Sequence, residues 1–182
     1  MRRAAGCCAA ARRVVQAVRL DEFNNAERMH AVAALRPCAD VTRWCEQVAD
    51  HRPYATVDAL LAQARRAAEP FTSAEIEVAL AHHPRIGERP STDSTEASMS
   101  RSEQSGVDPS DGEVQDALVR GNRAYEARFG RVFLIRAAGR DAREILASLS
   151  ERLEHSPEQE ERIVAEQLRE IALLRLKGMM EA

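Results

Sequence analysis

Two short motifs contain the residues of this chain that are best suited to chemistry. They are His82-His83-Pro84-Arg85-Ile86-Gly87-Glu88 and Ser100-Arg101-Ser102-Glu103-Gln104. Proline disfavours the αR conformation in the residue before it, so we predict that His83 leaves the preceding helix with its imidazole directed off the helix end. A histidine can donate or accept a proton near neutral pH, and a carboxylate such as Glu103 can orient it or bind substrate N–H groups. The two motifs therefore indicate an acid/base site.

The second motif has the S-x-x-E spacing of a capping box. Ser100 and Glu103 are predicted to begin a helix and to place the carboxylate at the positive end of that helix. Both motifs also have a purely structural interpretation, because a histidine before proline can simply end a helix and a capping box can be only a cap. Of the two neighbouring histidines only His83 precedes proline, so we expect His82 to matter little.

Length and composition favour a single folded domain. The chain has 182 residues, of which 45% are hydrophobic and 30% are charged, which is enough for a core of its own. The formal net charge is −3, but residues 1–20 contain five arginines and no acidic residue. The rest of the chain therefore has 21 basic against 29 acidic residues and a charge of −8. An acidic body of this kind argues against a nucleic-acid partner.

The start of the chain has a different character. We interpret residues 1–19 as an Arg/Ala-rich extension, disordered or helical, ahead of a folded domain at residues 20–182. The apolar run at residues 4–11 is short and is followed at once by Arg12 and Arg13, which makes a poor secretory signal. No segment approaches the roughly 18 apolar residues of a membrane span. These features predict a cytoplasmic protein.

The four cysteines do not form a recognisable metal or redox motif. They are Cys7, Cys8, Cys38 and Cys45, and no pair of them has the C-x-x-C spacing. A site made of Cys38, Cys45 and His51 would need an additional fourth ligand to bind zinc. We therefore predict reduced thiols and no metal site.

Apolar residues recur at helical spacing along nearly all of the chain. Helix starts are predicted from N-cap residues and capping boxes at Asn25, Asp40, Thr56, Thr72, Ser100, Asp108, Asp141 and Ser156. Residues 88–99 are interpreted as a polar connection that can close over a site, Gly130 as a helix end, and residues 132–135 as an extended piece or one buried turn. Tyr125 is a predicted core residue whose hydroxyl could reach a site. The chain is thus predicted to be an all-α protein, a single compact domain of about seven or eight helices.

In their order along the chain, these motifs resemble the 2-oxo-4-hydroxy-4-carboxy-5-ureidoimidazoline (OHCU) decarboxylases of urate breakdown. The resemblance runs from Phe23 to Leu176, and its motifs are Cys38, Arg43-Trp44, Arg52-Pro53-Tyr54, His83-Pro84-Arg85-Ile86-Gly87, Ser100 with Glu103-Gln104, Asn122 with Tyr125, Phe129-Gly130 with Phe133-Leu134-Ile135, Arg152-Leu153 and Leu174-Arg175-Leu176. Each motif is weak alone, but the ordered set is specific. Two stretches depart from the family pattern: Ala39-Asp40 replaces the common Gly-Ser, and Arg131-Val132 stands where many members have an aromatic residue and a proline.

The resemblance implies an all-helical enzyme that works without a cofactor. His83 corresponds to the family's catalytic histidine, a proton donor, and Glu103 is expected to position the substrate. The further substrate-binding residues that the resemblance implies are Pro84, Ser100, Gln104, Ile135, Arg136, Ala137, Ala138, Gly139 and Arg175. The expected reaction is loss of CO2 from OHCU and protonation of one face of the carbanion to give (S)-allantoin. The adjoining imine and carbonyl can absorb the carbanion, so no metal or electron-sink cofactor is needed.

Two other functions are compatible with the residues. A helical hydrolase would use His83 and Glu103 to activate water and would release no CO2. A non-catalytic helical binding protein would use its basic N-terminal arm on nucleic acid, but charges of both signs are mixed along the helices. The expected partner is therefore a small-molecule substrate, with no nucleic acid and no membrane, and a homodimer is left open.

Overall fold

The computed structural model of the chain describes residues 19–81, 83–87, 95–106 and 112–181. Within these ranges it contains nine α-helices and no strand, so the predicted all-α fold is confirmed. The helices are α1 (Leu20–Asn25), α2 (Arg28–Leu35), α3 (Thr42–Asp50), α4 (Val57–Ala67), α5 (Ser73–Leu80), α6 (Thr95–Glu103), α7 (Gly112–Phe129), α8 (Ala142–Arg152) and α9 (Pro157–Glu181). Helix α1 was not predicted, because its six residues are too few to show a helical repeat. None of the described helices is long and apolar enough to cross a membrane.

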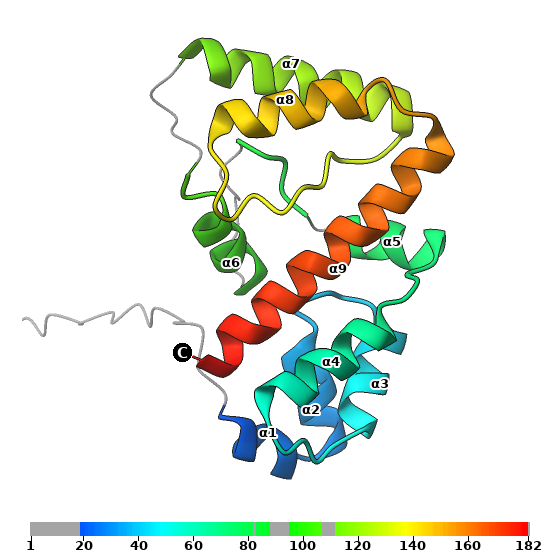
Figure 1. The fold of residues 1–182 in the computed structure, drawn as a ribbon, viewed down its shortest axis with the longest axis vertical. Coiled ribbons are helices and arrows are strands. Elements are labelled where there is room, and N and C mark those ends of the chain that lie inside the picture. Colours follow the sequence, from blue (N-terminus) through cyan, green and yellow to red (C-terminus); the bar gives the residue numbers. More distant parts are fainter. Residues whose placement is uncertain (1–18, 82, 88–94, 107–111, 182) are drawn as a thin grey trace, which may run out of the picture.

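Helix α9 runs through the middle of the molecule (Figure 1). Helices α1 to α4 lie on one side of it, α7 and α8 lie side by side on the other, and α5 and α6 flank its middle. Buried apolar side chains form two clusters. The first, around Trp44, Leu60 and Leu168, joins α1 to α5 with α9. The second, around Tyr125 and Ile145, joins α7 to α8.

Residues 132–137 run between the two clusters without helical structure. Phe133 and Ile135 belong to the α7–α8 cluster, whereas Leu134 between them belongs to the other cluster. Side chains that alternate in this way are the mark of an extended chain. The predicted extended piece is therefore confirmed, and it lies at the boundary between the two parts of the core.

Most local signals begin or end the helices as predicted. The confirmed signals are Thr56 at α4, the capping boxes Thr72–Glu75 at α5 and Asp141–Glu144 at α8, the reciprocal pair Ser156–Gln159 at α9, and Gly130, with φ of +70°, after α7. Each N-terminal signal satisfies backbone N–H groups that the first turn of a helix leaves without an internal partner.

Two predicted starts near the N-terminus are wrong. Asn25 ends α1 instead of beginning a helix, and its amide donates to the Asp21 carbonyl. Asp40 does not cap α3, whose N-cap is Val41, because the Asp40 carboxylate is paired with Arg36. The predicted start at Asp108 lies outside the described residues.

The predicted helix start at Ser100 is also wrong. Helix α6 already begins at Thr95, so Ser100 and Glu103 lie in its last turns and form no capping box. Both side chains have other partners, since Ser100 Oγ accepts from Gln104 and the Glu103 carboxylate is bound by Arg175. The end of the predicted polar connection is therefore helical, and the earlier part of that connection, residues 88–94, lies outside the described residues.

Candidate active site

His83 follows the end of α5 and lies outside the helix, as predicted. Its backbone N–H still donates to the Leu80 carbonyl at 3.0 Å, and its ring Nδ1 lies 3.3 Å from the Ala79 carbonyl oxygen. Because a carbonyl can only accept, Nδ1 carries the hydrogen of the neutral ring and Nε2 carries the lone pair. Nε2 is buried and has no hydrogen-bond partner within the described part of the chain. His83 therefore presents a desolvated proton acceptor, while the neighbouring His82 lies outside the described residues.

Burial and the nearby Arg175 cation lower the pKa of His83 to about 4, although the contact with the Ala79 carbonyl acts in the opposite direction. Burial disfavours the charged imidazolium, and a like charge adds repulsion. The ring is thus neutral at pH 7. A proton placed on Nε2 is correspondingly easy to give away, which suits a group that must accept a proton and then return it.

Arg175 of α9 meets Glu103 of α6 in a two-pronged ion pair. Its Nε and Nη2 atoms lie 2.6 and 2.9 Å from the two carboxylate oxygens, and Nη1 donates to the Pro37 carbonyl at 3.2 Å. The Arg175 side chain is 3% exposed and that of Glu103 is 14% exposed. Glu103 lies at the C-terminal end of α6, not at the positive end that the capping box predicted, and the helix dipole disfavours a carboxylate there. The arginine supplies the compensating charge.

The predicted pairing of His83 with Glu103 takes a different form. No hydrogen bond joins the two side chains in the residues that the structure describes. Each is instead coupled to Arg175, whose positive charge opposes protonation of His83 and whose guanidinium forms the ion pair with Glu103. No local signal could have revealed this arrangement, because Arg175 follows Glu103 by 72 residues.

Three carboxamide side chains hold the backbone of Ile86 and Gly87. The Gly87 N–H donates to Gln104 Oε1 at 3.0 Å, Gln115 donates to the Gly87 carbonyl at 2.8 Å, and Asn122 donates to the Ile86 carbonyl at 2.9 Å. Gly87 has φ of +83°, a conformation that favours glycine. Gln115 and Asn122, both on α7, were not among the predicted site residues, and only Asn122 had a signal, as part of a family motif.

Two of the predicted substrate-binding residues support this loop. Gln104 not only accepts from Gly87 but also donates to Ser100 Oγ at 3.3 Å, and Ser100 is buried. Pro84 is partly buried next to His83. The structure thus brings these predicted residues together around the backbone that follows the histidine.

Of the predicted residues 135–139, Ile135 and Ala137 lie beside this region, Gly139 is exposed, and the Arg136 side chain pairs with Glu170 at 3.4 Å. Ile135 and Ala137 pack in the same cluster as Ile86, and a Cβ placed on Gly106, just after α6, would lie 2.6 Å from the Arg140 carbonyl. Among the described residues, the backbone N–H groups of Ile135 and of residues 137–139 have no hydrogen-bond partner. The segment therefore offers several N–H donors beside the loop of His83.

The cysteines near this region are neutral thiols. Cys38 and Cys45 are free and buried, and burial raises the pKa of the Cys38 thiol to about 12 although the Arg175 cation opposes it. His51 is exposed and its ring contacts the Gln47 carbonyl. Across the described ranges no three potential metal ligands are grouped.

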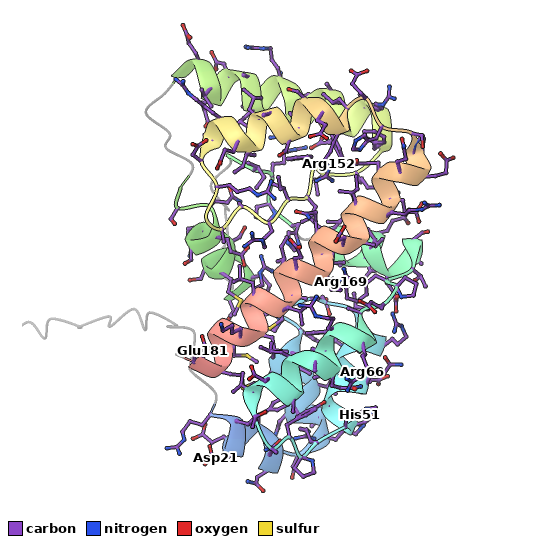
Figure 2. All side chains as sticks on the ribbon, in the orientation of Figure 1. Asp21, His51, Arg66, Arg152, Arg169 and Glu181 are labelled. Atoms are coloured by element: carbon purple, nitrogen blue, oxygen red, sulfur yellow. The ribbon has the colours of Figure 1, made fainter. Side chains whose placement is uncertain are left out.

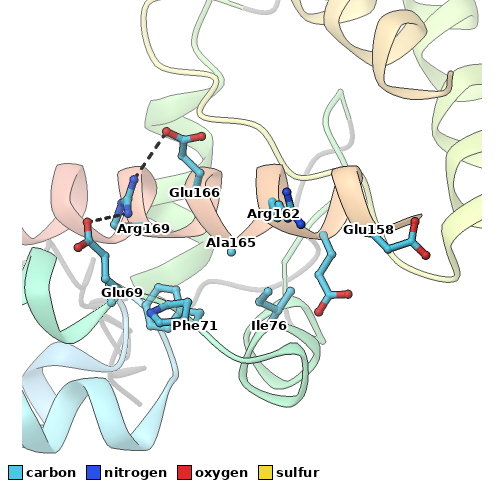
Figure 3. Close-up of a pocket in the computed structure, with 11 residues that line it drawn as sticks. Glu69, Phe71, Ile76, Glu158, Arg162, Ala165, Glu166 and Arg169 are labelled. Atoms are coloured by element: carbon cyan, nitrogen blue, oxygen red, sulfur yellow. Dashed lines mark hydrogen bonds and ion pairs between the residues drawn. The ribbon is translucent and has the colours of Figure 1, made fainter. Parts of the chain in front are cut away.

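A cleft of about 680 Å³ lies along α9 (Figure 3). Its wall includes Phe71 and Ile76, and three of its charged side chains pair with each other. Arg169 donates to Glu69 at 2.8 Å and lies 3.6 Å from Glu166. None of the predicted site residues lines this cleft.

The neutral, partly buried imidazole of His83, the arginine-bound carboxylate of Glu103 and the unpaired backbone donors are groups that can transfer a proton and bind a small polar molecule. Residues 24–177 match the family model described as OHCU decarboxylase, and the chain therefore belongs to the OHCU decarboxylase family. Its enzyme class is that of the carboxy-lyases, which cleave a carbon–carbon bond with release of CO2.

Curated relatives and solved structures agree with this assignment. The 2-oxo-4-hydroxy-4-carboxy-5-ureidoimidazoline decarboxylase of Haloferax volcanii is 28% identical over 158 residues, which cover 86% of this chain and 93% of the relative. A uric acid degradation bifunctional protein of Bacillus sp. is 23% identical over 161 residues, which cover 88% of this chain and 32% of that protein.

The fold is shared with two crystal structures. An OHCU decarboxylase in the presence of (S)-allantoin aligns with a TM-score of 0.66 and 23% identity over 86% of this chain and 100% of that chain. An (S)-allantoin synthase aligns with a TM-score of 0.62 and 17% identity over 90% of this chain and 54% of that chain. At these identities the likeness establishes the helical fold.

Proposed function

We propose that this chain decarboxylates OHCU to (S)-allantoin and that His83 moves the proton. The observation that carries the proposal is the neutral, buried and unpartnered Nε2 of His83 close to the Arg175 cation. Family membership supports the reaction, and the relative from Haloferax volcanii is named as a decarboxylase of the same substrate. We further propose a cytoplasmic enzyme with residues 20–182 as its catalytic domain, residues 1–19 as an extension, and a small-molecule partner, without nucleic acid or membrane.

The name of the substrate defines the bonds involved. One ring carbon carries both the hydroxyl and the carboxylate, and its neighbour carries the ureido group on a C=N double bond. When CO2 leaves, its bonding electrons form a C=C bond between these carbons, and the imine electrons move to the ring nitrogen, which takes a proton from water. The resulting enol becomes allantoin when its hydroxyl loses a proton and the ureido-bearing carbon gains one.

His83 is suited to both halves of this last step. Nε2 accepts the hydroxyl proton, and the imidazolium then delivers it to the ureido-bearing carbon from one face. The low pKa of His83 makes the imidazolium a ready donor. The contact of Nδ1 with the Ala79 carbonyl keeps the ring in one orientation, and delivery to one face gives a single enantiomer.

Glu103 and the extended segment would hold the substrate against the imidazole. Arg175 holds the Glu103 carboxylate in one orientation, and the carboxylate oxygens have further lone pairs for ring or ureido N–H groups. The unpaired backbone N–H groups of residues 137–139 would donate to substrate oxygens. Gln104 contributes mainly by supporting Gly87, since its amide oxygen is already occupied.

The test is turnover of OHCU freshly made from urate, followed by CO2 release and by the optical activity of the product, with the spontaneous racemic background subtracted. His83→Ala is expected to lower kcat by about 100-fold or more, the typical contribution of a general acid/base group, with unchanged helical circular dichroism. His30→Ala, at an exposed histidine of α2, is the matched control and should be silent. His82→Ala should also do little. Near-normal turnover in His83→Ala would refute the role of His83, and substrate consumption without CO2 would favour the hydrolase.

A further inference from the structure

Ile135 is 4% exposed, and neither its backbone N–H nor its C=O has a hydrogen-bond partner among the described residues. Buried peptide groups are nearly always paired, because an unpaired group costs free energy. The peptide groups on either side of Ile135 are each held by a side chain. The Leu134 carbonyl accepts from Arg152 Nη1 at 2.8 Å, and the Arg136 N–H donates to Gln167 Oε1 at 3.0 Å.

These two contacts determine where the groups of Ile135 point. A trans peptide is planar and directs its C=O and N–H to opposite sides. The Arg152 contact on the Leu134 carbonyl therefore sets the direction of the Ile135 N–H in the same peptide. In the next peptide, the Gln167 contact on the Arg136 N–H sets the direction of the Ile135 carbonyl. One buried residue thus presents an oriented donor and an oriented acceptor.

We propose that Arg152 and Gln167 are positioning residues. They orient the backbone N–H and C=O of Ile135 so that these two groups can hydrogen-bond to a neighbouring C=O and N–H of the substrate. This inference rests on the proposed function and adds two residues to it. A ureido group or a cyclic amide has an N–H next to a C=O, which is the complement of the pair that Ile135 presents. Neither Arg152 nor Gln167 would touch the substrate.

Arg152, the last residue of α8, is itself immobilised by a buried network. It lies near the N-terminal part of α9 (Figure 2), and its Nε donates to Glu160 at 2.8 Å. Tyr125 also donates to Glu160, and the Arg152 guanidinium lies 4.6 Å from the ring centroid of Phe133. An arginine with this many partners has one geometry, because its planar fork must satisfy all of them at once.

Gln167 is the better residue for a test, because it is only partly buried and its replacement is compatible with folding. Gln167→Leu removes the acceptor, and Gln167→Glu keeps a side-chain oxygen at the same place. Glu166→Leu, which also introduces a leucine but at the neighbouring exposed position of α9, is the matched control. Arg152→Lys, which keeps the charge but lacks the fork, is a second probe of the other contact.

Steady-state kinetics on OHCU and the melting temperature are measured for each variant. Gln167→Leu is expected to raise KM about tenfold, the effect of one misaligned hydrogen bond, with kcat within about twofold. Gln167→Glu should return KM to within about threefold of the unmodified enzyme, and Glu166→Leu should leave it unchanged. A second readout uses [15N]isoleucine: adding (S)-allantoin should shift the Ile135 amide resonance strongly in the unmodified enzyme and weakly in Gln167→Leu.

The outcomes separate the two proposals. If the unmodified enzyme releases CO2 but KM is the same in Gln167→Leu, or only the melting temperature falls, the positioning role is refuted and the proposed function stands. If the Ile135 amide resonance does not respond to (S)-allantoin, the positioning role is refuted as well. If the unmodified enzyme does not act on OHCU, the proposed function itself fails.

Discussion

Acid titration of the enzyme tests the charge state of His83 directly. The reaction needs the neutral ring, because Nε2 must accept a proton before it can return one. With a pKa of about 4, about 90% of His83 stays neutral at pH 5, whereas a histidine with an ordinary pKa near 6.5 would be only about 3% neutral there. We therefore expect kcat/KM to stay nearly level from pH 8 to pH 5 and to reach half its value near pH 4.

The measurement is the initial rate of (S)-allantoin formation at low substrate concentration, because kcat/KM reports the free enzyme. Circular dichroism at each pH is the control for folding. The folded pKa of His83 lies below the unfolded value, so the unfolded chain binds a proton that the native state excludes. The contribution of His83 to the free energy of unfolding is complete above pH 6.5 and is lost as the pH falls toward 4. The loss amounts to about 3 kcal/mol.

A fall in kcat/KM with its midpoint near pH 6.5, in protein that is still folded, would refute the assignment of a neutral ring with a buried Nε2. Arg175→Gln gives the complementary change. It removes the cation that disfavours protonation, so the pKa of His83, followed by NMR of the ring protons, should move upward. A pKa that does not move would show that burial alone controls it.

Three further results are expected. Glu103→Gln should lower kcat/KM by about tenfold or more and also lower the melting temperature, because it removes the anion that holds Arg175; full activity would mean that Glu103 is only a structural partner. Exhaustive treatment with EDTA should leave activity intact, because the electrons left by CO2 can delocalise within the substrate and the described residues contain no group of three metal ligands. Activity that returns only with a divalent ion would favour a metal-assisted hydrolase. Gly106→Ala should lower the free energy of unfolding by about 1–3 kcal/mol, because its Cβ would lie 2.6 Å from the Arg140 carbonyl. Gly112→Ala, where a Cβ would have nothing within 4 Å, is the control, and equal melting temperatures of the two variants would contradict this packing.

The fold was largely predictable because its signals are local. Capping residues such as Thr72 and Asp141 act on N–H groups two or three positions away, so the sequence alone places them. The helix start predicted at Ser100 is wrong, because an equally good local signal is overridden by the ion pair of Glu103 with a distant helix. A charge-assisted contact is stronger than a cap, but nothing near Glu103 in the sequence indicates it.

For the candidate site, the sequence predicted where His83 lies relative to α5 but not the chemical state of its ring. That His83 precedes a proline could be read directly, and its place outside α5 followed. Its tautomer depends on the Ala79 carbonyl, and its pKa depends on burial and on Arg175, which are properties of the folded chain. Arg175 and residues 135–139 were candidates only through the family resemblance. Gln167, which aligns Arg136, had no signal at all.

Helix α9 carries three of the contacts described above, at Glu160, Gln167 and Arg175. These positions are seven and eight residues apart, which is close to two helical turns each time. One inserted or deleted residue between Gln167 and Arg175 would rotate everything beyond it by about 100° and shift it by about 1.5 Å. The arginine would then face away from Glu103. During evolution the length of this part of α9 is therefore expected to stay constant while surface loops vary, so a gap within it in an otherwise related chain would mark a protein that has lost this activity.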